Sequence, residues 1–339
     1  MKKICGLLAA LVLLAGLAAC GGQRPTPTIR IGVALYLQED TFIATMAREL
    51  QQLALAEEQA RDVKINLNLA DGRSSQTVQN EQVDRFLDQG YDVICVNIVD
   101  RTAAAVIVDK AQAAGVPVIF FNREPVREDL DRWENAYYVG TQGAQAGQLQ
   151  GQIVLDAWRE EQAGLDRNGD GVLQYVMLEG EAGHQDDLLR TEYRIKTLSQ
   201  GGVAAEKLAG DTADWKRGLA GIRMKQWLEE FGGGIEAVFA NNDDMALGAI
   251  DACLEAGVEE LPFIVGVDAT QPALQAVEDG TLKGTVRNDA VGQMEKMLSL
   301  ACALAEGRDP AEAVELTDGK YVWLEHEIVT KETLESSAG

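Results

Sequence analysis

Residues 166–190 read D-R-N-G-D-G-V-L-Q-Y-V-M-L-E-G-E-A-G-H-Q-D-D-L-L-R, and this stretch contains the three kinds of segment from which the chain is built. It opens with a loop rich in side-chain oxygens, residues 166–172. The apolar run 173–178 follows and predicts a buried strand. Residues 180–190 then make a turn and open a helix. A polar loop, a buried strand and a helix in succession are typical of an α/β unit.

The loop has the spacing of an EF-hand calcium loop. Oxygen-bearing side chains stand at alternate positions, and a glycine stands at the sixth position, where the chain must turn sharply around the ion. Position 12 should be a bidentate glutamate and is Met177, so one ligand must come from another segment. A solvated turn is the alternative, because Asp and Asn also favour turns. The candidate ligands in the loop are Asp166, Asn168, Asp170, the carbonyl oxygen of Val172, and Gln174.

Short apolar runs alternate with helical patterns along the rest of the chain. This alternation predicts βαβ units with parallel sheets, and a chain of 339 residues is long enough for two such domains. The expected strands are residues 29–37, 63–69, 93–97, 116–121, 137–140, 173–178, 204–208, 235–240, 263–267, 285–287 and 321–324.

The composition limits the partners of the protein. Hydrophobic residues make up 46% and charged residues 25% of the chain, which indicates a globular protein and not a disordered one. A net charge of −24 disfavours nucleic acid and anionic membrane surfaces as partners, so a neutral ligand, a cation or a basic partner fits better. Cys95, Cys253 and Cys302 form no C-x-x-C pair, and we expect them to be buried.

The N-terminus reads as a targeting segment. Lys2 and Lys3 precede the apolar run 7–17, and L-A-A-C ending at Cys20 resembles the lipobox of bacterial lipoproteins. We therefore expect residues 1–20 to be a lipoprotein signal peptide, Cys20 to be lipidated, and residues 21–28 to be a tether. An apolar leader with a chance cysteine is the alternative.

Polar side chains follow almost every expected strand. The carboxyl ends of parallel strands meet at one edge of a sheet, where ligands bind. Each residue taken alone is equally explained as a helix cap, but so many from both halves of the chain indicate a site. Carboxylates accept hydrogen bonds, amides donate and accept them, and Arg190 offers a fork of donors, which together suit a neutral polyhydroxy ligand. These residues are Asp40, Asn122, His184, Asp186, Asn242, Asp268 and Asn288.

Two aromatic residues are candidates for contact with a ring. Phe42 and Trp215 are expected to open helices on opposite halves of the chain, the second helix over residues 214–230. Their flat faces suit a sugar ring, and ordinary core packing is the alternative. His326 has no partner in the sequence pattern and receives no role.

Eight segments resemble bacterial galactose/glucose-binding proteins, the periplasmic-binding-protein receptors of ABC importers and chemotaxis. They are R-I-G-V at 30–33, V-P-V-I-F-F-N-R-E-P at 116–125, A-Y-Y-V-G-T at 136–141, the D-R-N-G-D-G loop, L-E-G-E-A-G-H at 178–184, F-A-N-N-D-D-M-A-L-G at 239–248, V-G-V-D-A at 265–269 and G-T-V-R-N-D-A at 284–290. The resemblance covers roughly residues 30–324. It implies two doubly wound parallel-sheet domains joined by a multi-strand hinge, a periplasmic binding protein of type I, and it implies that the chain is not an enzyme.

The resemblance also implies roles for residues. It assigns the aromatic sandwich to Phe42 and Trp215, and it places the missing calcium ligand at Glu236. Arg123 stands where the family often has Lys, which changes the geometry but not the charge. The implied sugar ligands are Asp40, Asn122, His184, Asp186, Arg190, Asn242, Asp268 and Asn288.

The implied mechanism is capture of D-galactose or D-glucose by hinge closure and delivery to an ABC permease. One lobe comprises residues 29–141 plus 288–322 and the other residues 142–287 plus 323–339, with a hinge near Thr141, Asn288 and Val322. The implied partners are a monosaccharide, the permease and a chemoreceptor, with structural calcium in the second lobe. The protein is expected to be a monomer that binds no nucleic acid and contacts the membrane through its lipid anchor.

Three alternatives remain open. A glycoside hydrolase would use two carboxylates such as Asp40 and Asp268. A sugar-responsive repressor would need a basic DNA-binding headpiece, where this chain has its leader. A binding protein for another hexose or pentose is the third. Glucose and galactose are not distinguished, since an aspartate beside an epimeric hydroxyl accepts from either position.

Overall fold

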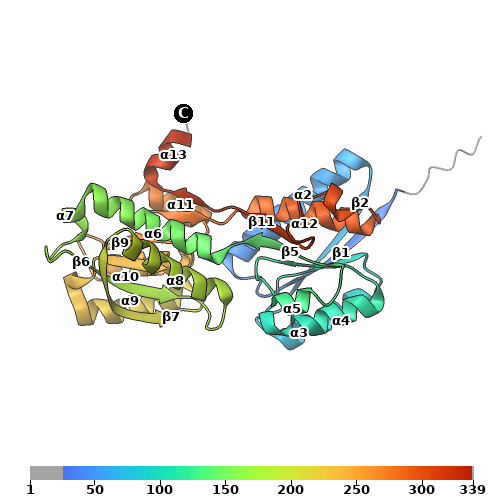
Figure 1. Cartoon of the computed structure of the whole chain (residues 1–339), viewed down its shortest axis with the longest axis horizontal. Helices are drawn as coiled ribbons and strands as arrows, with labels where there is room; N and C mark the ends of the chain where they lie inside the picture. Colours follow the sequence, from blue (N-terminus) through green and yellow to red (C-terminus); the bar gives the residue numbers. More distant parts are fainter. Residues whose placement is uncertain (1–25, 338–339) are drawn as a thin grey trace, which may run out of the picture.

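The computed structural model describes residues 26–337, and it shows two α/β bodies joined along the long axis of the molecule (Figure 1). We call the body that contains the first strand the N-terminal lobe, and the other the C-terminal lobe. The expected leader, Cys20 and most of the tether lie outside the described residues.

The N-terminal lobe contains a six-stranded parallel sheet with the strand order β11-β5-β4-β3-β1-β2. Its central strands are apolar runs buried on both faces, as parallel sheets covered by helices require. The edge strand β2 instead carries alternating polar residues. The strands are β1 (Thr28–Leu35), β2 (Lys64–Asp71), β3 (Val93–Val96), β4 (Val118–Phe121), β5 (Ala136–Thr141) and β11 (Tyr321–Leu324).

The C-terminal lobe contains a four-stranded parallel sheet with the order β7-β6-β8-β9. Single parallel bridges from Val265 to Gly284 and from Asp268 to Arg287 bring β10 beside β9, and β10 pairs with β12 in antiparallel fashion. The strands are β6 (Val172–Glu179), β7 (Ala204–Thr212), β8 (Ala237–Ala240), β9 (Phe263–Val265), β10 (Thr285–Arg287) and β12 (Glu327–Val329).

Helices cover both faces of each sheet, and each covered face has its own apolar core. The expectation of doubly wound parallel sheets is therefore confirmed. The helices are α2 (Thr41–Arg61), α3 (Gln76–Asp88), α4 (Ala104–Ala114), α5 (Arg127–Leu130), α6 (Gly143–Glu160), α7 (Gln162–Leu165), α8 (Gln185–Gln200), α9 (Arg217–Phe231), α10 (Asp243–Glu255), α11 (Gln271–Glu278), α12 (Ala290–Ala305) and α13 (Lys331–Ser337). Within the described part of the chain, none of them has the length and apolar character needed to cross a membrane.

The chain passes between the lobes three times, from β5 to α6, from β10 to α12 and from β11 to β12. Side chains tie these passages together. Thr141 Oγ1 donates to Asn288 Oδ1 over 3.2 Å, and the backbone N–H of His326 donates to Gln145 Oε1 over 2.9 Å. His326, which received no role from the sequence, is thus a buried part of the connection between the lobes.

The structure corrects one expected helix. Residues 214–230 were expected to be helical, but α9 begins at Arg217 because Asp214 and Trp215 have left-handed backbone conformations, with φ of 49° and 64°. Trp215 therefore lies in a turn before the helix and does not open it. The prediction for Cys95, Cys253 and Cys302 is confirmed, since all three are buried and free.

A candidate ligand site between the two sheets

One pocket with about 370 Å³ of empty space lies between the lobes and is lined by all ten residues predicted to bind sugar. Carboxyl ends of strands from both sheets face it, as expected for α/β proteins. The N-terminal lobe and its hinge passages contribute Asp40, Phe42, Asn122 and Asn288, and the C-terminal lobe contributes His184, Asp186, Arg190, Trp215, Asn242 and Asp268. The other lining residues are Tyr36, Ile43 and Arg123.

Asp40 is held by two donors at the start of α2. Its Oδ1 accepts from the backbone N–H of Ile43 over 2.9 Å, so it caps the helix, and its Oδ2 accepts from the Tyr36 hydroxyl over 2.6 Å. Each carboxylate oxygen still has a lone pair for a ligand. Asn122 accepts at Oδ1 from Asn97 over 3.1 Å, which leaves its Nδ2 group free to donate into the pocket.

His184 caps α8 through its imidazole ring. Its Nδ1 accepts from the backbone N–H of Asp186 over 3.2 Å, so Nε2 carries the proton and is a donor. Burial, reinforced by the Arg123 and Arg190 charges, holds the pKa of His184 well below its ordinary value. The Trp215 ring lies edge-on to His184 with centroids 5.2 Å apart, and a Cβ at Gly180 would overlap the indole.

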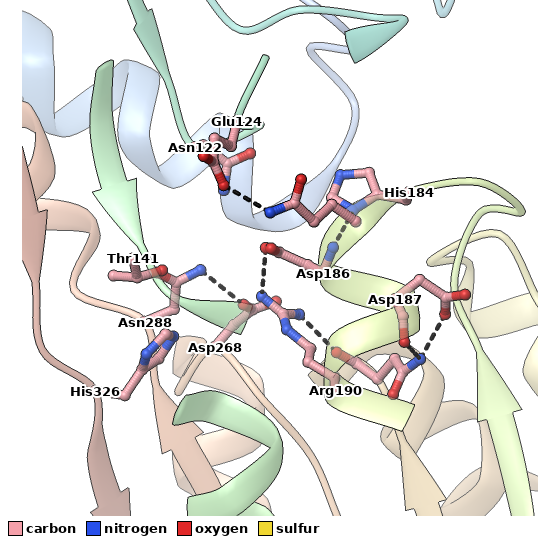
Figure 2. Close-up of polar contacts among 12 residues, drawn as sticks. Asn122, Glu124, Thr141, His184, Asp186, Asp187, Arg190, Asp268, Asn288 and His326 are labelled. Carbon is pink, nitrogen blue, oxygen red and sulfur yellow. Dashed lines mark hydrogen bonds and ion pairs between the residues drawn. The ribbon is translucent and has the colours of Figure 1, made fainter. Parts of the chain in front are cut away.

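Arg190 is a buried cation of the site, and only 4% of its surface is exposed. Its guanidinium donates to the carbonyl oxygen of Asn241 over 2.7 Å and pairs with Asp186 over 3.3 Å (Figure 2). Its Nε has no hydrogen-bond partner among the described residues, so one donor is left over. Burial raises the pKa of Asp186, and the Arg190 charge partly offsets that effect.

Asp268 and Asn288 meet on the hinge side of the pocket. Asn288 Nδ2 donates to Asp268 Oδ1 over 3.3 Å (Figure 2). Asn288 Oδ1 accepts from Thr141 and from Gln293. Burial raises the pKa of Asp268 well above its ordinary value. Across the pocket, Asn242 caps α10 through Oδ1. The pocket therefore combines carboxylate acceptors with amide, imidazole and guanidinium donors. That combination matches a ligand with several neutral hydroxyl groups. None of the described residues that line the pocket is a lysine that could bind an anion.

Side chains from the two lobes also contact each other around the pocket. Arg123 pairs with Glu181 over 2.9 Å, and Gln185 Nε2 donates to Glu124 Oε2 over 2.7 Å. On another side, Thr41 Oγ1 donates to Asp244 Oδ2 over 2.6 Å. The lobes are therefore closed on each other.

The predicted calcium loop folds around its own acidic side chains. Asp166 accepts backbone N–H groups from Asp170 and Gly171 at 3.0 and 2.9 Å, and Gly171 has the positive φ that this turn requires. Glu236 lies against the loop, where its two carboxylate oxygens accept from the backbone N–H groups of Arg167 and Gln174 at 2.6 and 2.9 Å. Glu236 is distant in sequence, but it thus contacts the loop whose twelfth position, Met177, supplies no coordinating carboxylate.

The donor chemistry of this loop fits a hard cation. Glu236 is 2% exposed, and no ion pair of the described residues involves it, Asp166 or Asp170. No three acidic, histidine or cysteine side chains of residues 26–337 lie close enough together to hold a metal by themselves. A calcium ion here would therefore also need the amide oxygens of Asn168 and Gln174 and the carbonyl oxygen of Val172.

Comparison with known proteins decides the family. Residues 31–309 match the periplasmic binding protein domain. The chain is a periplasmic binding protein. It is 39% identical over 284 residues to the D-galactose/methyl-galactoside binding periplasmic protein MglB of Haemophilus influenzae, covering 84% of this chain and 83% of that one. It is 32% identical to a xylitol-binding protein of Mycolicibacterium smegmatis, covering 91% of this chain and 82% of that one.

A solved structure supports the same assignment. An ABC transporter solute binding protein from Bacillus halodurans with bound myo-inositol superposes with a TM-score of 0.74 at 31% identity, covering 93% of this chain and 99% of that one. Periplasmic binding proteins bind a solute and leave it chemically unchanged, so the prediction that this one is not an enzyme is confirmed, and the hydrolase alternative is set aside. The family implies an extracytoplasmic location.

Sequence reasoning gave no binding role to three residues that line the pocket of this binding protein. Arg123 follows β4 beside Asn122 and was noted there without a role, and Tyr36 follows β1, where the same strand-end rule would have found it. Arg123 is stacked with its guanidinium carbon 3.5 Å from the centre of the Tyr36 ring. Ile43 is an apolar residue in the first turn of α2, and no sequence signal distinguishes it from core.

Proposed function

We propose that the protein captures a neutral monosaccharide, D-galactose or D-glucose, between its two lobes and delivers it to an ABC permease. The observation that carries this proposal is that ten polar and aromatic residues, from opposite lobes, converge on a single pocket. Each of the polar residues is held by neighbours in a way that leaves donors or acceptors facing the pocket. Both lobes can contact a ligand only when closed, so binding shifts the protein towards the closed form.

The relatives support a sugar as the ligand. The Haemophilus influenzae relative is named for D-galactose and methyl-galactoside, and the others bind xylitol and myo-inositol. All of these are neutral polyhydroxy compounds, in agreement with the donor and acceptor set of the pocket. A second candidate is therefore a different hexose, a pentose or a polyol such as myo-inositol.

Phe42 and Trp215 would cover the ring of the sugar. They come from opposite lobes and line the same pocket. Aromatic faces bury the apolar C–H groups of a sugar ring while the hydroxyl groups bind the polar residues at its edge. The ring would thus be enclosed when the lobes close.

Calcium, the lipid anchor and the partners complete the proposal. Calcium would be held by Asp166, Asn168, Asp170, Val172, Gln174 and Glu236. It would neutralise the acidic side chains that have no cationic partner and brace the C-terminal lobe at a distance from the sugar. A lipid on Cys20 would attach the protein to the cell membrane. The permease and a chemoreceptor would bind the closed conformation. The lobes would divide at Thr141, Asn288 and Val322.

A thermal-shift screen tests the ligand. The protein is melted alone and with D-galactose, D-glucose, D-ribose, xylitol and myo-inositol at millimolar concentration. We expect D-galactose or D-glucose to raise the melting temperature most, because a ligand that binds only the folded protein stabilises it. A larger shift with xylitol or myo-inositol would favour the second candidate. No shift with any compound would contradict sugar binding.

A further inference from the structure

A second cavity lies beside the ligand pocket and on the same seam between the lobes. It spans about 880 Å³ of empty space, part of it open to solvent, against about 370 Å³ measured in the same way for the pocket. Residues 99–102, Arg123 and Glu124 line it from the N-terminal lobe, and residues 181–185 line it from the C-terminal lobe. We call it the seam cavity.

The two cavities share a wall. Arg123 and His184 line both, so the seam cavity begins at the corner of the pocket where these two side chains stand. Arg123 is only 5% exposed and is fixed by its contacts with the Tyr36 ring and with the Val99 carbonyl oxygen, 3.1 Å away. A group attached to the bound ring at this corner would reach the seam cavity by passing between these two side chains.

Contacts between the lobes border the seam cavity. Gln185 of α8 donates to Glu124 and also contacts Arg101, and Arg123 pairs with Glu181 (Figure 2 shows Glu124 and His184 at this edge). These contacts bridge residues of opposite lobes, so the cavity persists in the closed form. It can hold part of a ligand while the lobes are closed.

The lining favours an uncharged polar occupant. Arg123 and Glu181 neutralise each other, and Arg101 donates to the Glu124 carbonyl oxygen over 3.1 Å. Asp100 is occupied as the cap of the turn that follows it. Among the described residues that line this cavity, each charged side chain already has a hydrogen-bond or ion-pair partner, so a charged group would have to compete with existing contacts, whereas hydroxyl groups can add to them.

We infer that the seam cavity is a subsite for a ring-sized neutral substituent on the bound sugar, so that the ligands include disaccharides or glycosides of that size. This inference rests on the proposed function, because the first ring must occupy the pocket. The small side chains at Ala182 and Gly183 leave room on the C-terminal side, and the space exceeds that of the pocket that would hold one ring.

Calorimetry with linkage isomers tests the subsite. D-galactose, D-glucose, lactose, melibiose and gentiobiose are titrated into the full protein, because these disaccharides attach the second ring at different positions. We expect at least one disaccharide to bind within about tenfold of the better monosaccharide, a difference of ~1.4 kcal/mol. If monosaccharides bind and every disaccharide is weaker by more than about tenfold, the subsite is wrong while the proposed function stands. If no sugar binds, both are wrong.

A variant locates the second ring. Ala182→Trp places an indole in the seam cavity, and we expect the ratio of disaccharide to monosaccharide affinity to fall at least about tenfold. Leu254→Trp, at an exposed position of α10, is the matched control and should leave that ratio unchanged. A ratio that is the same in wild type and Ala182→Trp would overturn the assignment of the second ring to this cavity.

Discussion

Arg123 and Glu181 form a 2.9 Å ion pair that joins the two lobes beside the ligand pocket. Arg123 follows the strand β4 of one sheet and Glu181 follows β6 of the other, so the pair exists only when the lobes are closed. The same arginine lines the pocket and stacks on Tyr36. Closure of the lobes and the lining of the pocket therefore share a side chain.

Breaking this pair should weaken ligand binding modestly. Glu181 is 39% exposed at its side chain, so we expect Glu181→Gln to lower sugar affinity about twofold to fivefold, the range of partly exposed pairs. The difference from wild type should shrink as salt is raised, since salt screens exposed charges. Calorimetry at two salt concentrations measures this. Asp109→Asn, which breaks an exposed pair with Arg132 inside one lobe, is the control and should not change affinity. An equal effect of both variants would contradict the role in closure.

Removing the Tyr36 hydroxyl should weaken binding through Asp40. Tyr36→Phe keeps the ring that stacks on Arg123 but leaves Asp40 Oδ2 without its 2.6 Å donor. The freed carboxylate loses its fixed orientation, and we expect an affinity loss of about fivefold, or ~1 kcal/mol. Tyr193→Phe on α8, whose ring contacts Lys196, is the control. Unchanged affinity in Tyr36→Phe would show that the α2 cap alone orients Asp40.

Sugar affinity should fall on acidification at a higher pH than ordinary carboxylates would cause. Burial raises the pKa of Asp186 and that of Asp268 in the closed protein. Because these pKa values are raised, the folded protein without ligand binds these protons at a higher pH than the unfolded chain does. Its free energy of unfolding therefore rises as pH falls through the raised values and decreases as pH rises through them. Sugar hydroxyl groups donate to the ionised carboxylates, so protonation opposes binding. Calorimetry from pH 8 to pH 5 checks this.

The variant Asp268→Asn separates the two carboxylates. It should bind more weakly than wild type at neutral pH and show a smaller change in affinity across the same pH range, because one titrating group is gone. If wild type binds equally well across the range, neither carboxylate accepts from the ligand in its ionised form.

Arg194 should be replaceable by an apolar residue with a gain in stability. It is fully buried on α8, its Nε donates to the Arg190 carbonyl oxygen over 2.8 Å, and its terminal nitrogens have no hydrogen-bond partner among the described residues. Burial lowers the pKa of Arg194 to about 9, so the charge is held at neutral pH at a cost. We expect Arg194→Met to raise the free energy of unfolding by about 1–3 kcal/mol. Denaturant unfolding measures it, and exposed Arg132→Met should give no gain.

Chelation should destabilise the protein through the loop at residues 166–174. EDTA is expected to lower the melting temperature of wild type, because an ion bound only by the folded form stabilises it. Glu236→Gln should start from a lower melting temperature and respond less to EDTA. Glu58→Gln, whose carboxylate accepts from the Ile65 backbone in the other lobe, should respond like wild type. Melting curves that EDTA leaves unchanged in wild type would argue against calcium.

The sequence predicts the sheets and most of the pocket because both follow from local patterns. Apolar runs such as β3 are buried on both faces, and polar residues at strand ends meet wherever parallel strands are adjacent. The places of Asp40 and Asn242 in the pocket could be predicted from this rule alone. They cap the helices that follow, and their side chains still line the pocket.

Other features depend on contacts that no local pattern encodes. Asn122, Trp215 and Asp268 have φ of 60°, 64° and 122°, conformations that non-glycine residues adopt only when the surrounding structure holds them. The contact of Gln185 with Glu124 depends on closure of the lobes, which spacing along the chain cannot reveal. The approach of Glu236 to the calcium loop came from the family resemblance alone.

The most direct test of the account is a calorimetric titration of D-galactose and D-glucose into wild type and Asp268→Ala. Asp268 is buried in the pocket and bonded to Asn288 of the hinge passage, so a sugar between the lobes must meet it. We predict that wild type binds one sugar per chain and that Asp268→Ala loses at least about 100-fold in affinity, or ~2.7 kcal/mol. Equal affinity of the two proteins for the sugar that wild type binds would contradict the site.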